Sequence, residues 1–336
     1  MSDDTLCIPA GGAEPGLNGV IECPEPWRLY HGDWLERPRI AFRLIGPSDA
    51  PVVAVLGGIS AHRAPAGADG WWREFVGPHR GVDTTRFRVL GMDYLGGLGE
   101  SSTPDGAGAF PPVSSVDQAD ALCRIVRHLR LGSLHAVVGA SYGGMVALCL
   151  AARHAQAVGR IVILSASERA HVLSTAWRSV QRQIVREALV RGDGAAGLKL
   201  ARALAMATYR SPAEFAARFA GPPIRAGGRF RFPVESYLFA RGDDYVQKYR
   251  AESFLSLSES IDLHAVDASQ VRTPATLIAI RQDQLVPFGD MHDLAGRLAG
   301  VTRFHAIDSI FGHDAFLKEN TLLNPLIDTA LTEAPI

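Results

Sequence analysis

Hydrophobic residues along this chain fall into short apolar runs separated by longer amphipathic stretches. Pro51–Gly57 (PVVAVLG) is apolar throughout, which is typical of a strand buried on both faces of a parallel sheet. Val113–Leu131 places its apolar residues on one helical face and predicts a helix. Strands and helices that alternate at this spacing predict a doubly wound α/β sheet. The other expected strands are Trp27–His31, Ile40–Gly46, Arg86–Asp93, Leu134–Gly139, Arg160–Leu164, Ala275–Ile280 and Thr302–Ile307, and the other expected helices are Gly143–His154, Gly289–Leu298 and one from about Asp314.

The alternation is interrupted between about Ser165 and Ala265. This stretch predicts helices with arginine-rich faces, joined by short loops. A helical block inserted into an alternating sheet indicates a lid over the core. We therefore expect a catalytic core made of residues 1–165 and 266–336, and a lid domain at residues 166–265.

The predicted lid is basic, although the chain as a whole is not. Residues 166–250 contain fifteen Lys or Arg and seven Asp or Glu, whereas the formal charge of the whole chain is −1. A basic segment on a nearly neutral protein favours a local anionic partner over a nucleic acid or a membrane. Solvated helix faces explain the same charge equally well.

The first thirty or so residues are rich in Gly and Pro and predict a loosely structured arm. The beginning of the chain lacks a cationic stretch followed by an apolar run, so we expect no signal peptide, no membrane span and a cytoplasmic protein. The four cysteines show no metal-ligand spacing, and no metal site is expected. Cys123 and Cys149 lie within apolar-periodic stretches and are predicted to be small buried residues.

A candidate nucleophile is Ser141 in Gly139-Ala140-Ser141-Tyr142-Gly143, which matches the pattern G-x-S-x-G. The preceding HAVVGA predicts a strand and the following GGMVALCLAARH predicts a helix. This strand–turn–helix context is the nucleophile elbow of the α/β-hydrolase fold, which exposes a strained serine above the sheet. A chance match in a chain with 34 glycines is the alternative, and the two correct flanks argue against it.

A serine hydroxyl needs a general base and a partner that orients the base. His313 follows the last predicted strand, and Asp283 follows the strand Ala275–Ile280 directly. Both therefore lie at carboxyl ends of strands, where an open α/β sheet gathers its ligands. We expect a Ser141–His313–Asp283 triad. The alternatives are a solvated turn aspartate and a capping or core histidine.

The negative charge that develops on the substrate oxygen needs two preorganised N–H donors. One is expected to be the backbone N–H of Tyr142, which follows the nucleophile. The other is expected in the loop after strand Pro51–Gly57, at Gly57 or alternatively at Gly58, because glycine lets the backbone approach the substrate closely.

These residues together resemble the homoserine O-acetyltransferase family and its relatives that acylate serine or use succinyl-CoA. The likeness runs from about Val53 to Leu317 and is strongest in GWW, VESYL and GHDAF, because G-x-S-x-G alone is shared by many hydrolases. The matching motifs are SAH (Ser60–His62), GWW (Gly70–Trp72), GP (Gly77–Pro78), DTTRF (Asp83–Phe87), LGG (Leu95–Gly97), SYGGM (Ser141–Met145), TYRS (Thr208–Ser211), VESYL (Val234–Leu238) and GHDAF (Gly312–Phe316).

The resemblance implies a ping-pong acyl transfer from acyl-CoA to Ser141 and then to an amino-acid hydroxyl, as in methionine biosynthesis. It implies acyl-CoA as co-substrate, no bound cofactor, and a homodimer formed through the lid. It maps amino-acid recognition onto Arg202, Tyr209 and Asp314. Arg202 and Tyr209 are seven residues apart, so they lie on nearly the same face of one helix. On residue type alone, a surface arginine, a lid-core tyrosine and a helix cap are the alternatives.

The chain departs from the family pattern in the oxyanion loop, where Val55–Ile59 replaces the usual His-Ala-Leu-Thr-Gly. It is also shorter than most members before the elbow. Leu285, two residues after the expected catalytic acid, is typical of acetyl-transferring members, whereas members that use succinyl-CoA tend to carry Arg there. This residue favours acetyl as the transferred group, although an arginine from the lid offers succinyl transfer as the alternative.

Three arginines of the predicted lid, Arg178, Arg182 and Arg186, recur every four residues and form one stripe on a helix. They could meet the phosphates of CoA, but a solvated helix face is the favoured interpretation. The favoured function is acylation of homoserine. Acylation of serine, and hydrolysis by an esterase or thioesterase with the same triad, are the alternatives, and an intact triad argues against a non-enzymatic homologue.

Overall fold

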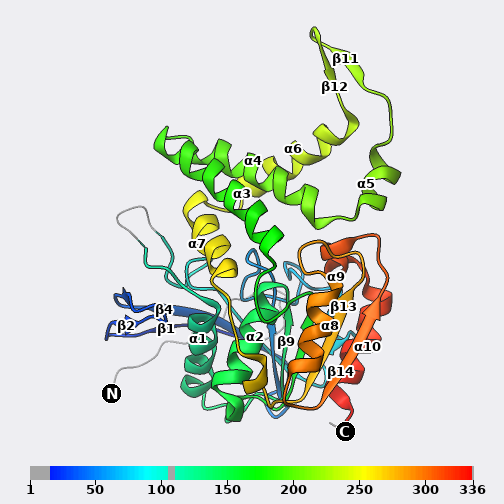
Figure 1. The fold of residues 1–336 in the computed structure, drawn as a ribbon. Coiled ribbons are helices and arrows are strands. Elements are labelled where there is room, and N and C mark those ends of the chain that lie inside the picture. The colour runs from blue at the N-terminus through cyan, green and yellow to red at the C-terminus, as the bar shows by residue number, and fades with distance from the viewer. Residues whose placement is uncertain (1–15, 105–109, 335–336) are drawn as a thin grey trace.

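A computed structural model describes residues 16–104 and 110–334 of the chain. Its centre is an eight-stranded, mostly parallel sheet that is flanked by helices on both faces (Figure 1). This is the α/β-hydrolase fold that the sequence predicts. In their order across the sheet the strands are β1 (Gly16–Glu22), β4 (Arg39–Ile45), β8 (Arg88–Met92), β5 (Val52–Leu56), β9 (Ala136–Ala140), β10 (Ile161–Leu164), β13 (Ala275–Ile280) and β14 (Thr302–Ile307).

The central strands are buried because helices cover them on both sides. Every residue of β5, β9, β10 and β13 is buried, which is why these segments are apolar throughout. On one face α1 (Ser115–His128), α2 (Tyr142–Arg153) and α8 (Phe288–Arg297) contribute to the larger hydrophobic core, which includes Cys123 and Cys149 as predicted. On the other face the core is completed by α10 (Asn320–Thr332) and by residues 72–82.

The expectation of a loose arm over the first thirty residues is wrong for the part that the structure describes. Residues Gly16–Glu22 form β1, which pairs antiparallel with β4 from Gly16↔Ile45 to Glu22↔Arg39 and is an outermost strand of the sheet. The Gly and Pro content of the segment obscured a strand whose backbone hydrogen bonds go to β4. The predicted strand Trp27–His31 shortens to β2 (Trp27–Arg28), which pairs only with β3 (Trp34–Leu35), outside the main sheet.

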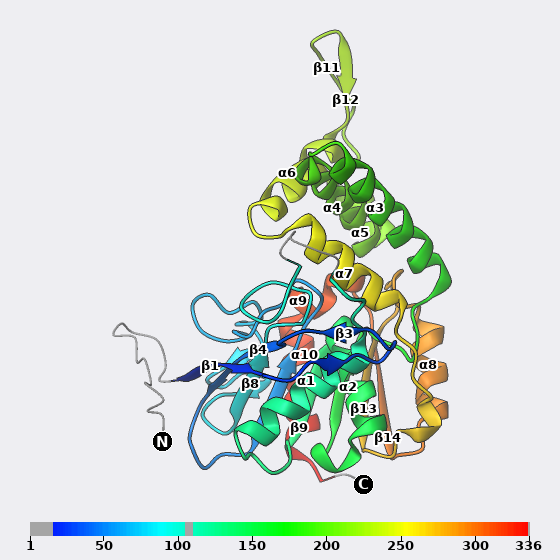
Figure 2. The same cartoon turned by 90° about the vertical axis from the view of Figure 1, so that its left-hand side faces the viewer.

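The segment between β10 and β13 is mainly helical, as predicted. It lies over the edge of the sheet at which the parallel strands have their carboxyl ends, and "the edge" refers to this edge below (Figures 1 and 2). Its two connections to the core run side by side. The Val266 N–H donates to Glu168 O at 2.9 Å, and Arg169 and Ala265 form an isolated antiparallel β-bridge. We call residues 166–265 the helical segment. Its helices are α3 (Val172–Val190), α4 (Gly194–Tyr209), α5 (Pro212–Phe219), α6 (Pro233–Val246) and α7 (Ala251–Asp262).

The helical segment also contains a β-hairpin that the pattern did not predict. Strand β11 (Ile224–Ala226) pairs with β12 (Arg229–Arg231) and projects away from the rest of the molecule (Figure 2). Gly227 and Gly228 both have positive φ, at 58° and 77°, which is the backbone that a two-residue hairpin turn requires. The Gly-Gly pair was therefore the overlooked signal.

The remaining elements are short. Strands β6 (Val76–Gly77) and β7 (Val82–Asp83) pair with each other, and 3-10 turns lie at η1 (Ala155–Ala157), η2 (Ala268–Gln270) and η3 (Gly312–Asp314). The single terminal helix expected from about Asp314 is divided into α9 (Ala315–Lys318) and α10. Glu319 separates the two helices, because its ψ of 54° is not helical.

Candidate active site

The turn between β9 and α2 holds Ser141 in a backbone conformation that L-residues seldom adopt, with φ 54° and ψ −122°. Such strain persists only where the surroundings fix it. Here the Ser141 N–H donates to Leu164 O at 2.9 Å, and the Gly144 N–H donates to Ser141 O at 2.9 Å. The hydroxyl is thereby held above the edge of the sheet at the N-terminus of α2, as a nucleophile elbow requires.

The glycines around Ser141 allow the strand and the helix to approach each other. A Cβ atom on Gly139 would lie 2.3 Å from the carbonyl oxygen of Gly143, and one on Gly143 would lie 2.2 Å from that of Leu56. The first carbonyl lies in the first turn of α2 and the second ends β5, so neither can move without disturbing the helix or the sheet. These positions therefore require glycine for packing, which accounts for both glycines of the G-x-S-x-G pattern.

The structure brings the two other predicted triad residues to Ser141. His313 Nε2 lies 2.9 Å from Ser141 Oγ, and His313 Nδ1 lies 2.7 Å from Asp283 Oδ2. The second carboxylate oxygen of Asp283 accepts hydrogen bonds from the backbone N–H groups of Leu285 and Val286, at 2.8 and 3.0 Å. The carboxylate is thus oriented by its own loop, and it orients the imidazole.

The environment of His313 tunes its basicity. Burial by itself lowers the pKa of His313, but the charge of Asp283 and its hydrogen bond outweigh burial, so the pKa is raised above the usual 6.5. A base with a raised pKa takes a proton from a hydroxyl more readily. The arrangement can therefore activate Ser141 by general-base catalysis and return the proton to a leaving group.

The predicted oxyanion loop lies next to Ser141. Gly58 lines the cavity at the nucleophile, and a Cβ atom on it would be 4.0 Å from Ser141 Cβ. Gly57 lies beneath Trp71, and its carbonyl accepts hydrogen bonds from the Gly143 N–H and the Tyr94 hydroxyl. The Tyr142 side chain is buried, with its hydroxyl 2.5 Å from Ser260 Oγ, so only its backbone faces the elbow turn.

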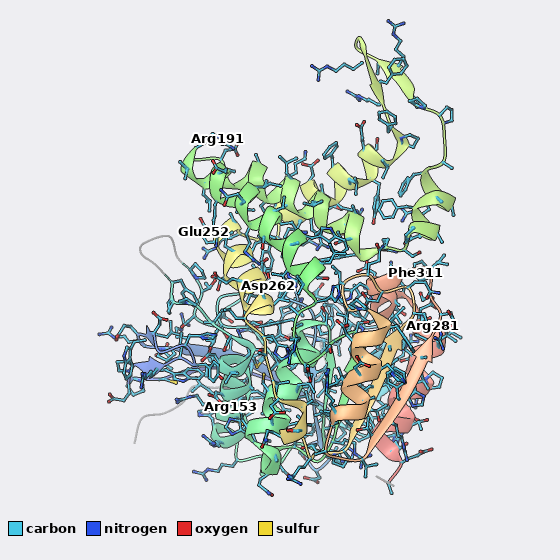
Figure 3. The ribbon with its side chains drawn as sticks, in the orientation of Figure 1. Arg153, Arg191, Glu252, Asp262, Arg281 and Phe311 are labelled. Carbon is cyan, nitrogen blue, oxygen red and sulfur yellow. The ribbon has the colours of Figure 1, made fainter. Side chains whose placement is uncertain are left out.

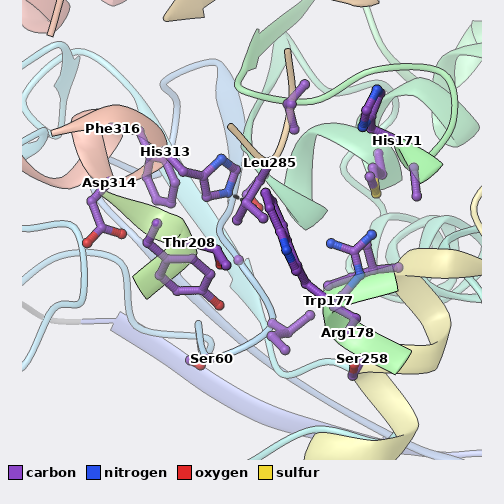
Figure 4. A pocket seen from close by; sticks show the side chains of 18 of the residues that line it. Ser60, His171, Trp177, Arg178, Thr208, Ser258, Leu285, His313, Asp314 and Phe316 are labelled. Atoms are coloured by element: carbon purple, nitrogen blue, oxygen red, sulfur yellow. Dashed lines mark hydrogen bonds between the residues drawn. The ribbon is translucent and has the colours of Figure 1, made fainter. Parts of the chain in front are cut away.

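The cavity above Ser141 is lined by residues of both the sheet edge and the helical segment (Figure 4). Arg202 and Tyr209 of α4 line it together, as their seven-residue spacing predicts. The Arg202 guanidinium carbon lies 5.2 Å from the centre of the Tyr209 ring and 4.6 Å from that of Tyr245. Among the described residues no carboxylate forms an ion pair with Arg202 within 4 Å, so the aromatic rings are its nearest partners, while the charge of Asp314 acts on it from further away.

Asp314 lines the same cavity but already has a cationic partner. Its Oδ2 lies 2.8 Å from Arg210 Nε, and Arg210 also contacts Glu214 at 3.0 Å. Burial raises the pKa of Asp314 although Arg210, His313 and Arg202 act against it. The sequence reasoning did not single out Arg210, whose only signal was its place in the TYRS motif.

Leu285, the position expected to influence the choice of acyl group, lines the same cavity as His313. Its side chain lines the cavity, and its carbonyl oxygen accepts a hydrogen bond from Ser174 Oγ of α3 at 2.8 Å. The first turn of α3 is thereby fixed to the loop that carries the acid. Sequence reasoning also gave no site role to Trp177 and Ser60, which line the cavity, or to Tyr245. The Ser60 hydroxyl lies 3.0 Å from the Tyr245 hydroxyl.

The GWW and GHDAF motifs are joined by a hydrogen bond. Trp72 is buried and donates its indole N–H to Phe316 O at 2.7 Å, one turn after His313. Trp71 donates to His62 O at 2.9 Å and so connects GWW with SAH. These hydrogen bonds connect the loops that surround the site, and Trp71 itself lines the cavity.

The expectation of a solvated arginine stripe on the helical segment is wrong for two of its three members. Arg182 is buried and Arg178 is only 12% exposed, and both pair with Asp262 of α7, at 2.5 and 2.6 Å. Arg186 alone matches the expectation, because its side chain is 49% exposed and lies 4.0 Å from Glu259. The spacing predicted one helical face correctly, but a face of α3 that is covered by α7 cannot be recognised from the sequence of α3.

Within residues 16–104 and 110–334, no group of three or more His, Cys, Asp or Glu side chains is arranged to hold a metal ion. In that same part of the chain, no helix has the length and apolarity needed to span a bilayer.

The comparisons with known proteins agree with this geometry. A family model described as alpha/beta hydrolase fold matches residues 51–319. A protein of Xanthomonas campestris named homoserine O-succinyltransferase is 39% identical over 95% of this chain and 85% of its own length. This chain belongs to the homoserine O-acyltransferase family of the α/β hydrolases. It is thus similar to enzymes of the acyltransferase class.

Other members of the family extend the likeness over nearly the whole chain. An L-serine/homoserine O-acetyltransferase of Streptomyces lavendulae is 33% identical over 93% of this chain and 96% of its own length. The crystal structure of a homoserine O-acetyltransferase from Bacillus anthracis superposes with a TM-score of 0.86 at 19% identity, covering 96% of this chain and 99% of that one. The structural match supports the fold.

Proposed function

We propose that this protein is an acyl-CoA-dependent O-acyltransferase whose acceptor is L-homoserine. One observation carries the choice of an amino-acid acceptor over water: Arg202 is a cation without a carboxylate partner among the described residues, in the same cavity as Ser141. A guanidinium there is suited to an α-carboxylate, with charge-assisted hydrogen bonds. Relatives named for homoserine support the acceptor.

In the first half-reaction, Ser141 Oγ attacks the thioester carbonyl of acyl-CoA while His313 Nε2 takes the hydroxyl proton. The oxyanion is stabilised by the backbone N–H of Tyr142 and by an N–H of Gly57 or Gly58. The C–S bond then breaks, and His313 gives its proton to the sulfur, so free CoA leaves and an acyl ester remains on Ser141.

In the second half-reaction, His313 takes the proton of the homoserine hydroxyl, and the hydroxyl oxygen attacks the ester carbonyl. The tetrahedral intermediate collapses, and the bond to Ser141 Oγ breaks. His313 then returns the proton to Ser141. Asp283 keeps the imidazole in one orientation through both steps and stabilises its charged form.

The acceptor is bound by Arg202, Tyr209 and Asp314 in this proposal. The Tyr209 ring lies 5.9 Å from the His313 ring, which brings the amino-acid end of the cavity next to the base. Arg202 binds the carboxylate, and the Tyr209 hydroxyl adds a hydrogen bond. Asp314 attracts the ammonium group while Arg210 holds its side chain in place.

The helical segment acts as a lid in this proposal, with the core at residues 1–165 and 266–336 and the lid at 166–265. Lid residues from α3, α4 and α7 line the cavity and reduce the access of water to the acyl-enzyme. That exclusion separates a transferase from an esterase with the same triad. A homodimer formed through the lid remains a prediction.

The proposal is tested by following free thiol in a purified protein supplied with acetyl-CoA or succinyl-CoA, with and without L-homoserine or L-serine. We expect thiol release to need an amino acid and to be faster with homoserine. Thiol release at the same rate without any amino acid would identify a thioesterase. A higher kcat/KM for serine would make serine the acceptor.

A further inference from the structure

A cluster of three largely buried charges lies where α3 meets α7, at the wall of the cavity. Arg178 donates from Nε and Nη2 to Asp262 Oδ1, at 2.9 and 2.6 Å, and Arg182 donates from Nη1 to Asp262 Oδ2 at 2.5 Å. The three side chains are only 12%, 9% and 10% exposed. Asp262 stands at the end of α7 nearest the sheet (Figure 3).

The charges of this cluster do not cancel, because two guanidinium groups share one carboxylate. Arg182 is further bound by the carbonyl and hydroxyl oxygens of Ser258 and by Ser179 Oγ. Arg178 Nη1 donates no hydrogen bond to any of the described residues, although Arg178 lines the cavity. A guanidinium nitrogen that is open to the cavity and has no protein partner can donate a charge-assisted hydrogen bond to an anionic ligand.

Arg178 Nη1 and the Arg202 guanidinium lie in different parts of the cavity. Ser174, one turn before Arg178 on the same face of α3, contacts the backbone of Leu285 beside the catalytic acid. Figure 4 shows Arg178 and Ser258 on one side of the Trp177 ring, with His313 and Asp314 on the other. The cavity therefore has one cation from α4 and another from α3.

One acceptor amino acid needs only one of these two cations for its carboxylate. We propose that Arg178 binds the free carboxylate of a dicarboxylic acyl group, so that the acyl donor is the CoA thioester of a dicarboxylic acid, with succinyl-CoA as the probe. The inference rests on the proposed function and assigns the donor that Leu285 cannot recognise by charge. The covalent steps are unchanged, because the distal carboxylate takes no part in the bonds formed and broken.

A phosphate of CoA offers the same anionic chemistry to Arg178. The two sources differ in what they predict, because every CoA thioester carries the phosphates and only a dicarboxylic acyl group carries the carboxylate. Comparing succinyl-CoA with acetyl-CoA on the same variant therefore separates them.

The experiment measures kcat/KM for succinyl-CoA and for acetyl-CoA, with saturating L-homoserine, in the wild type, Arg178→Gln and Arg178→Lys. Arg191→Gln is the matched control, since Arg191 lies at the far end of α3 and is 67% exposed. Arg182 keeps its contacts with Asp262 in both variants, and thermal unfolding monitors the fold. We expect Arg178→Gln to lose about 30-fold or more with succinyl-CoA and about threefold or less with acetyl-CoA. Arg178→Lys should regain part of the succinyl activity, and Arg191→Gln should match the wild type.

Three results would overturn the inference while leaving the proposed function intact. The wild type could prefer acetyl-CoA, which needs no variant to establish. Arg178→Gln could lose both donors equally, which would make its partner a phosphate of CoA or its role structural. It could also lose neither. Failure of both donors to acylate homoserine in the wild type would instead overturn the proposed function, and the donor assignment with it.

Discussion

The edge of the sheet and the helical segment above it both line the cavity, but they hold their side chains by different means. At the edge, Asp283 is held by N–H groups two and three residues further along the chain. In the helical segment, Arg178 is held by Asp262, which is 84 residues away in the sequence. The edge therefore depends on local backbone geometry, and the helical segment depends on the packing of one helix against another.

This difference separates the chemistry from the choice of substrates. The acid, base and nucleophile come from the edge, whereas Arg178 and Arg202, to which we assign the anionic groups of the substrates, come from α3 and α4. Changes in the helical segment can then alter the donor or the acceptor without disturbing the proton transfers. Three substitutions test that separation, and two glycine substitutions test the packing beneath it.

The largest effect is expected from Ser141→Ala, which removes the nucleophile at the edge. We expect acyl transfer to fall by about 10⁴-fold or more, with no acyl-enzyme detected by intact-protein mass spectrometry. The surface variant Ser48→Ala serves as a control and should keep full activity. An Ser141→Ala protein with substantial transferase activity would refute the covalent mechanism.

Asp283→Asn is expected to lower kcat by about 10³- to 10⁴-fold, because the imidazole loses its orienting carboxylate. The pH profile of kcat/KM tests the same contact. His313 acts as a base only when neutral, so activity should be lost as the pH falls through its raised pKa. Without the charge of Asp283, only Asp314 opposes the effect of burial on this pKa, and the acid limb should shift to lower pH. A limb that stays in place would assign it to another group.

Arg202→Gln is expected to act on the acceptor alone. The KM for L-homoserine should rise by about 30- to 100-fold, while the KM for acyl-CoA changes by about threefold or less, since only the amino-acid carboxylate loses its partner. Lys199→Gln, three residues earlier on α4 and paired with Asp243, is the matched control. Equal changes in both KM values would contradict the separation of the two anion sites.

The smallest effects concern stability and compare the buried Gly143 with the exposed Gly289. Gly143→Ala should lower the free energy of unfolding by about 3 kcal/mol or more, because its Cβ atom would meet a backbone oxygen of β5. Gly289→Ala in α8 meets nothing within 4 Å and should raise that free energy by about 0.5–1 kcal/mol, since alanine favours the helix. Denaturant titration measures both. Equal tolerance of the two substitutions would show that the elbow is not tightly packed.

Patterns within a few residues were sufficient for most of the fold and for the residues at the edge. The buried strands are continuous apolar runs, and β9, the Ser141 turn and α2 follow one another in the sequence as they do in space. The same local patterns failed where pairing reached further. Segment β1 needed β4 to be recognised as a strand, and the hairpin β11–β12 was hidden among amphipathic helices.

The sequence by itself determined the parallel sheet, the elbow and the order of nucleophile, acid and base, because each depends on backbone geometry that neighbouring residues specify. Only the tertiary structure decided the environment of the arginines. Arg178 and Arg186 lie on the same predicted helical face, yet Arg178 is largely buried beside Asp262 and Arg186 is solvated. Burial and ion pairing depend on which helix covers which face, and that property belongs to the packed molecule.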